Sequence, residues 1–159
     1  MCSSLIHEVY SYGNEKSIRE FWYNLNHGSH EYIIIRDMCM SKEDPAYHSL
    51  NLDMFNKVLK YGDAQQIEDF EKVWGKISKT SALIHFLYKY RYLDNWKREV
   101  EKNYFPIFVE DYKDLIDLNK FEIVHFEHYL LDYQKNIVKS DFHIELTSPT
   151  HVKWIFKRK

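Results

Sequence analysis

The chain contains very few residues that force a turn. Four glycines and three prolines are spread over 159 residues. Because glycine and proline are the strongest breakers of helices and strands, a sequence this poor in them favours long helices that end at the few breakers present. Gly13, Gly28 and Gly62 each follow a stretch with helical spacing of apolar residues. We therefore expect a mainly helical protein.

Length and composition fit a soluble globular protein. Hydrophobic residues make up 45% of the chain and charged residues 29%. A chain of this size buries roughly 70% of the surface that it exposes when unfolded, so its core needs no disulfide or metal to be stable. The formal net charge of −2 argues against a protein that binds polyanions through net charge alone. We expect a single globular domain spanning residues 1–159.

Several helices have recognisable first residues. Asn14 and Asp63 stand directly before apolar residues at helical spacing, and asparagine and aspartate are good N-caps. The predicted helical region covers residues 3–134, and residues 50–61 and 64–77 are predicted to form a helical hairpin around Gly62. The expected helices are residues 5–12, 14–27, 50–61, 64–77, 81–104, 107–118 and 121–133.

Two segments have strand-like patterns. Residues 29–40 are compatible with a buried strand or with a helix, and we favour the helix. Residues 141–147 and 151–156 alternate apolar and polar side chains on either side of Ser148-Pro149-Thr150, which predicts a β-hairpin over residues 141–157. The expected fold class is therefore mainly α, of the α+β kind: a multi-helix single domain with a small C-terminal β-hairpin.

The sequence also bears on location. Cys2 and Cys39 lie far apart and match no metal-finger spacing, so we expect reduced thiols. The first residues lack the basic and apolar regions of a secretory signal, and no apolar run reaches the roughly 18 residues of a membrane span. A cytoplasmic protein without membrane contact is the expectation.

Signatures of common enzyme classes are missing. The glycines cannot form a phosphate-binding loop, and no nucleophile elbow or H-E-x-x-H motif occurs. On a helix, Glu122, His125 and His128 would share one face and could chelate a metal, but the second Glu-x-x-His of a di-iron bundle is absent. We expect no metal and no cofactor, and we regard catalysis as less well supported than binding.

A basic, aromatic stripe is the first candidate binding surface. If residues 81–104 form one helix, tyrosine and arginine side chains recur on one side of it. These residue types are enriched at binding hot spots, although they can equally cover a neighbouring helix. The stripe consists of Tyr88, Arg91, Tyr92, Asn95 and Arg98.

An acidic stripe is the second candidate surface. Its carboxylates repel one another slightly, so a neighbouring basic helix or an external cationic surface would stabilise them. An ordinary solvated helix face is the structural alternative. The stripe consists of Glu110, Asp111, Asp114 and Asp117.

These surfaces lead to a ranked set of functions. The preferred one is a non-catalytic protein-interaction module, most concretely a cytoplasmic inhibitor or immunity protein that neutralises a toxin, such as a cationic nuclease, through both stripes. The alternative is a protein that binds RNA or single-stranded nucleic acid through the Tyr88–Arg98 face. A helical metal-dependent enzyme that uses Glu122, His125 and His128 is the third hypothesis.

Overall fold

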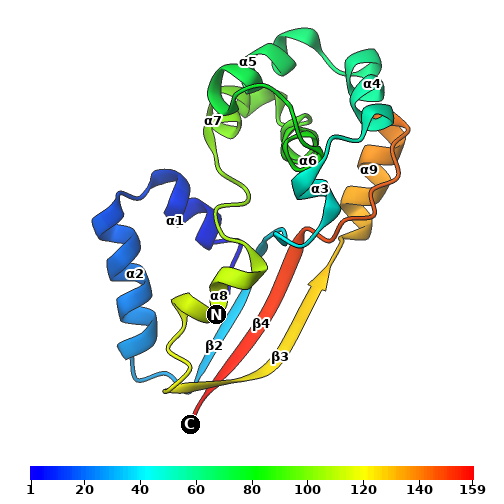
Figure 1. Cartoon of the computed structure of the whole chain (residues 1–159). Coiled ribbons are helices and arrows are strands. Elements are labelled where there is room, and N and C mark those ends of the chain that lie inside the picture. Colours follow the sequence, from blue (N-terminus) through cyan, green and yellow to red (C-terminus); the bar gives the residue numbers. More distant parts are fainter. The chain divides into compact units, whose positions relative to one another are not determined.

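The computed structural model describes residues 1–159, which form two compact units. Figure 1 follows the chain through both of them. Each unit is assembled from segments that are distant in the sequence. Unit 1 comprises Met1–Ser41, Asn103–Tyr129 and Pro149–Lys159, and unit 2 comprises Lys42–Lys102 and Leu130–Ser148. That one domain spans residues 1–159 stays a prediction.

Unit 1 is built on a four-stranded sheet with the strand order β1-β2-β4-β3. The strands are β1 (Cys2–Ser3), β2 (Tyr32–Met38), β3 (Phe121–Tyr129) and β4 (His151–Arg158). β1 is parallel to β2, whereas β4 lies antiparallel between β2 and β3 (Figure 1). β3 is therefore an edge strand.

Both β2 and β3 lie where the sequence favours a helix, so the helix predictions for residues 29–40 and 121–133 are wrong. In β2, burial alternates along the strand, and Ile33 and Ile35 enter the core. In β3, a bulge between Ile123 and His125 inserts one extra residue. The bulge breaks the period of two, so the apolar side chains of β3 acquire a spacing that resembles a helix.

Three helices lie on one side of this sheet: α1 (Ile6–Tyr12), α2 (Glu15–His27) and α8 (Tyr112–Leu115) (Figure 1). They pack on the alternate residues of β2 and β4 that face them. Each large apolar side chain buried in this way contributes about 1.5–3 kcal/mol. The buried cluster includes Ile6, Trp22, Ile33, Ile35, Tyr112, Ile116, Phe121, Val152, Trp154 and Phe156.

The predicted helix over residues 107–118 is also wrong, because only a 3₁₀ turn, η2 (Val109–Asp111), and the four-residue α8 form there. A side chain from α2 explains why α8 stops. The Asn26 amide donates to the Leu115 carbonyl at 2.9 Å and accepts from the Asp117 N–H at 2.8 Å. These two bonds bind backbone groups near the end of α8 and hold the chain in a non-helical path.

Unit 2 is helical. Its elements are α3 (Pro45–His48), α4 (Leu52–Tyr61), α5 (Ala64–Trp74), α6 (Thr80–Lys89), η1 (Leu93–Asn95), α7 (Trp96–Glu101) and α9 (Asp132–Phe142). Asn51 and Asp63 cap α4 and α5 by accepting from Met54 N–H and Gln66 N–H. Two helices joined at Gly62 form as predicted, but they do not pack against each other as a hairpin, because α4 packs on α6 and α9 whereas α5 packs on α7.

The long helix predicted over residues 81–104 is broken into α6, η1 and α7. Tertiary contacts hold the turn between them. Gln66 donates from Nε2 to the Tyr90 carbonyl at 3.1 Å, and Lys89 is fully buried with Nζ bonded to the carbonyls of Glu99 and Lys102. These side chains satisfy carbonyl groups at the ends of α6 and α7, so the chain turns without glycine or proline.

The C-terminal hairpin predicted over residues 141–157 does not form. α9 continues to Phe142 and ends at His143, whose φ of 55° is left-handed, and residues 144–148 belong to no strand. Residues 151–158 are a strand, as expected, but β4 pairs with β2 and β3 instead. The broader fold class is confirmed, because 52% of the residues are helical and a four-stranded sheet accompanies the helices.

Candidate functional site

The residues of the predicted basic stripe do not share one face. They are distributed over α6, the turn after it, η1 and α7 of unit 2. Tyr88 is buried, with 3% of its surface exposed. Arg91 forms a bidentate ion pair with Asp141, with one hydrogen bond of 2.5 Å to each carboxylate oxygen. The exposed members are Arg91, Tyr92, Asn95 and Arg98. Their role in binding stays a prediction.

The predicted acidic stripe lies in unit 1 and is also not a continuous helix face. Glu110 and Asp111 are half-buried in η2, and Glu110 accepts a hydrogen bond from the Ser41 hydroxyl. Asp117 follows α8, where the backbone N–H of Asn119 lowers the pKa of its carboxyl group. Asp114 is the member that presents an exposed carboxylate with no ion-pair partner.

The three metal candidates lie on β3, where the register separates them. Glu122 and His125 are opposite Lys157 and Ile155 of β4, whereas His128 is opposite Val152, which points to the other face of the sheet. No group of three or more metal-binding side chains comes together anywhere in the structure. The spacing that would align these residues on a helix therefore does not align them on a bulged strand.

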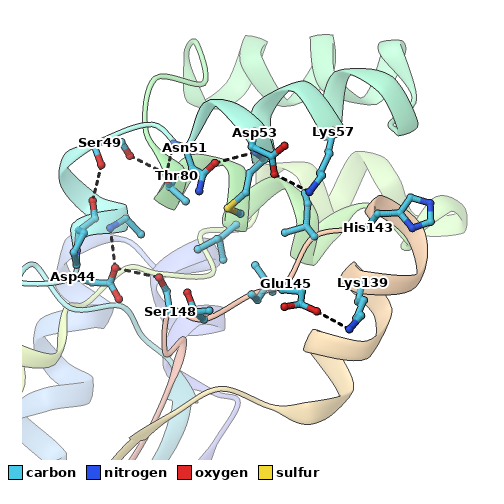
Figure 2. Close-up of a pocket in the computed structure, with 17 residues that line it drawn as sticks. Asp44, Ser49, Asn51, Asp53, Lys57, Thr80, Lys139, His143, Glu145 and Ser148 are labelled. Atoms are coloured by element: carbon cyan, nitrogen blue, oxygen red, sulfur yellow. Dashed lines mark hydrogen bonds and ion pairs between the residues drawn. The ribbon is translucent and has the colours of Figure 1, made fainter.

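A groove in unit 2 is the strongest candidate site. Its volume is about 730 Å³, which is within the usual range for ligand pockets. Figure 2 shows it between the start of α4 and α6 on one side and the chain that follows α9 on the other. The lining residues are Asp44, Pro45, Ala46, Ser49, Asn51, Asp53, Met54, Lys57, Thr80, Ile84, Lys139, His143, Ile144, Glu145, Leu146, Thr147 and Ser148.

The rim of the groove near α4 is fixed by capping bonds. Asn51 accepts from Met54 N–H at 3.0 Å, and its own N–H donates to the Thr80 hydroxyl at 2.8 Å. The Thr80 hydroxyl donates in turn to the Ser49 carbonyl at 2.9 Å. This chain of bonds, drawn in Figure 2, ties the start of α4 to the start of α6.

Most of the charged groups that line the groove are already paired. Lys57 lies 2.7 Å from Asp53 on α4, and Lys139 lies 2.6 Å from Glu145 (Figure 2). The bond from Lys139 lowers the pKa of the Glu145 carboxyl group, which is therefore charged at neutral pH. Asp44 has no lysine partner, and one of its oxygens accepts from Ala46 N–H and from the Ser148 hydroxyl. The lining thus retains one uncompensated negative charge, at Asp44.

Residues 144–148, here called the extended segment, form one wall of the groove. Ile144 and Leu146 are buried, whereas Glu145 and Thr147 are exposed, an alternation typical of a strand. No backbone N–H or C=O group of this segment is hydrogen-bonded within the chain. The wall therefore combines strand-like side chains with an unpaired backbone.

The sequence predicts part of the groove. The alternation in residues 141–147 predicts a strand, and Asn51 marks a helix start, but neither pattern indicates that the two segments enclose a groove. Asp44, Thr80 and Lys139 carry no motif that marks them as site residues. Only the tertiary fold brings these segments together.

The chain was also compared with known proteins. No protein-family model matches it, and neither a curated protein nor a solved structure shows significant similarity to it. None of its helices combines the length and the apolar character that crossing a bilayer requires.

Proposed function

We propose that this protein is a non-catalytic protein-interaction module that binds a partner protein in the groove of unit 2. The observation that carries the proposal is the extended segment: a strand-like wall whose backbone groups have no partner within the chain. Unpaired backbone groups beside apolar side chains are a typical feature of surfaces that bind peptide segments. A folded partner can supply such a segment from a loop or a strand.

The charges of the groove support binding over catalysis. Two ion pairs line the groove, one between Asp53 and Lys57 and the other between Lys139 and Glu145. General acids and bases act through groups that are free to exchange a proton with a substrate. Paired side chains at a rim instead help to orient a partner and to exclude mismatched charges.

A narrower form of the proposal is an inhibitor that neutralises a toxin with a cationic surface. It is supported by the exposed carboxylate of Asp114 in unit 1, which has no ion pair within the chain. An exposed carboxylate of this kind accelerates association with a positively charged partner and contributes modestly to affinity.

Nucleic-acid binding has weaker support. The face of the sheet opposite α1, α2 and α8 carries Lys153 and Lys157 on β4, but the register places Glu127 and Glu122 directly opposite them on β3. Carboxylates beside the lysines offset the attraction for phosphates. A filter-binding series in salt would reveal a steep negative slope if phosphate contacts dominated.

The test is a substitution that fills the groove. Met54→Arg places a long cationic side chain in the lining, whereas Leu59→Arg makes the same change on the same helix at a side chain that is 52% exposed and outside the lining. A partner that co-purifies with the wild-type protein is identified by mass spectrometry, produced separately and titrated calorimetrically. We expect Met54→Arg to weaken binding at least tenfold and Leu59→Arg to leave it unchanged.

Circular dichroism melts of both variants control for folding. If Met54→Arg folds normally and binds the purified partner as tightly as wild type does, the groove is not the binding site and the proposal fails.

A further inference from the structure

We infer that the groove accepts an extended apolar segment of the partner, with one basic side chain, which pairs as an added β-strand with residues 144–148. The inference rests on the proposed function and specifies the chemistry of the bound segment. Three features of the groove support it: its unpaired backbone, its apolar lining and the residual charge at Asp44.

The backbone of the extended segment is the first feature. Residues 144–148 follow the left-handed His143 and precede Pro149, and a residue before proline is restricted to extended conformations. The chain bends at Ser148, so at about 3.4 Å per residue residues 144–147 present roughly 14 Å of backbone for pairing. Since no N–H or C=O group of the segment has a partner within the chain, a second extended backbone can form a ladder along one of its edges.

Apolar side chains in the lining are the second feature. Exposed Pro45 and half-buried Met54 are the apolar lining residues that a ligand can contact directly. Ala46, Ile84, Ile144 and Leu146 also line the groove but are buried. In an added strand every second side chain points to the same side. Valine or isoleucine at alternate positions would therefore meet this apolar surface, while the intervening polar residues would face solvent.

Charge is the third feature and specifies the basic residue. The lining contains the carboxylates of Asp44, Asp53 and Glu145 but only two lysines, each of which is paired with one of the last two carboxylates. The Asp44 carboxylate keeps one oxygen without a hydrogen bond in the chain. A lysine or arginine at one end of the bound segment compensates this charge, whereas an acidic residue there is repelled.

The test uses synthetic peptides, because their backbone can be altered without changing their side chains. Two seven-residue probes alternate valine and threonine after an N-terminal lysine or before a C-terminal lysine, with both ends capped. They cover both strand directions relative to Asp44. We expect one of them to bind the full-length protein in a fluorescence or calorimetric titration, and its glutamate analogue to bind at least tenfold more weakly.

Backbone methylation then distinguishes a paired strand from mere side-chain contact. In a strand, the N–H groups of successive residues point to opposite edges, so those of every second residue lie on one edge. Methylating the amides of the valines in one peptide, and of the threonines in another, blocks one edge at a time. Strand addition requires that one methylated peptide loses at least tenfold in affinity while the other binds as the parent does.

Amide hydrogen exchange supplies a readout on the protein itself. Binding should protect one alternating set of amides, either residues 144, 146 and 148 or residues 145 and 147. The amide of Lys76, in the loop after α5, should be unchanged.

Three failures are distinguishable. If both methylated peptides bind like the parent, or if no amide of residues 144–148 becomes protected, strand pairing is wrong although the groove still binds protein. If neither probe binds while Met54→Arg still weakens binding of the purified partner, the inferred class of segment is wrong and the proposed function stands. If Met54→Arg leaves partner binding unchanged, the proposed function itself fails.

Discussion

The buried lysine of unit 2 gives the stability of this protein an unusual dependence on pH. Lys89 has no exposed surface, and its Nζ donates to the carbonyl groups of Glu99 and Lys102 and lies 5.7 Å from the centre of the Trp74 ring. Burial penalises the charged form and lowers the pKa of Lys89 from 10.5 to about 7, although the nearby Glu99 opposes the change. The neighbouring Lys102 lowers it further.

The sign of the effect follows from the proton balance. Between pH 7 and 10.5 the unfolded chain keeps the Lys89 proton and the folded chain releases it, so the free energy of unfolding rises with pH. Below pH 7 both states are protonated, and the burial penalty is fully present. A difference of one pKa unit corresponds to about 1.4 kcal/mol, which gives an increase of about 1.5 kcal/mol between pH 7 and pH 8.5.

The pH window is chosen to exclude other groups. Burial lowers the pKa of His85 to about 3, so that histidine gains its proton only in the unfolded state below about pH 6.5 and does not contribute above pH 7. Burial raises the pKa of Cys39, so stability is lost only as the unfolded thiol ionises, near its ordinary pKa of 9.0. Between pH 7 and 8.5, Lys89 should therefore dominate the slope.

Urea unfolding followed by tryptophan fluorescence at several pH values measures this slope. Lys89→Met should remove the increase and lower stability overall, because the buried carbonyls of Glu99 and Lys102 each lose one hydrogen bond and keep only the longer bonds to Lys102 N–H and His85 Nε2. Lys97→Met, at an exposed position of α7, should retain the wild-type slope. If Lys89→Met does not fold, the wild-type curve still decides: a flat or falling free energy of unfolding from pH 7 to 8.5 refutes the reasoning.

Two further predictions concern carboxylates of unit 1. Asp37 is buried, accepts from Ile6 N–H at 2.6 Å and lies 2.7 Å from His7 Nδ1, so Asp37→Asn should cost about 2–4 kcal/mol in urea unfolding. Exposed Asp94→Asn should cost less than about 0.5 kcal/mol, and equal losses would show that Asp37 is not a structural anchor. Asp114→Lys should slow association with a cationic partner about two- to fivefold at low salt and little at high salt, as measured by surface plasmon resonance. A salt-independent rate would remove Asp114 from the interface.

The parts of the fold that depend on local chemistry are predictable from the sequence. Asn14 and Asp63 cap helices as expected, because each side chain accepts a hydrogen bond from an N–H group only three residues away. The ends of α2 and α4 are equally local, because the N–H groups of Gly28 and Gly62 donate to the carbonyls of Asn24 and Val58, four residues earlier. No distant part of the chain takes part in these interactions, so the sequence pattern is sufficient.

Elements that depend on distant side chains are not predictable in this way. The break after Lys89 depends on Gln66, and the end of α8 depends on Asn26, in both cases from another helix. The bulge in β3 gives the apolar residues of this strand a helix-like spacing, so the sequence pattern predicts a helix there. Because both predicted binding stripes assume uninterrupted helices, the same long-range interactions separate their residues.

The wrong prediction of a C-terminal hairpin is informative about the site. Alternating apolar and polar residues report that alternate side chains are buried, and in residues 144–147 they are. Strand assignment needs in addition a neighbouring backbone, and the chain supplies none beside the extended segment. The segment therefore has the side-chain pattern of a strand while its hydrogen-bonding groups stay available at a groove. In the strand addition that we propose, a segment of a partner protein would complete the pairing that the sequence pattern anticipates.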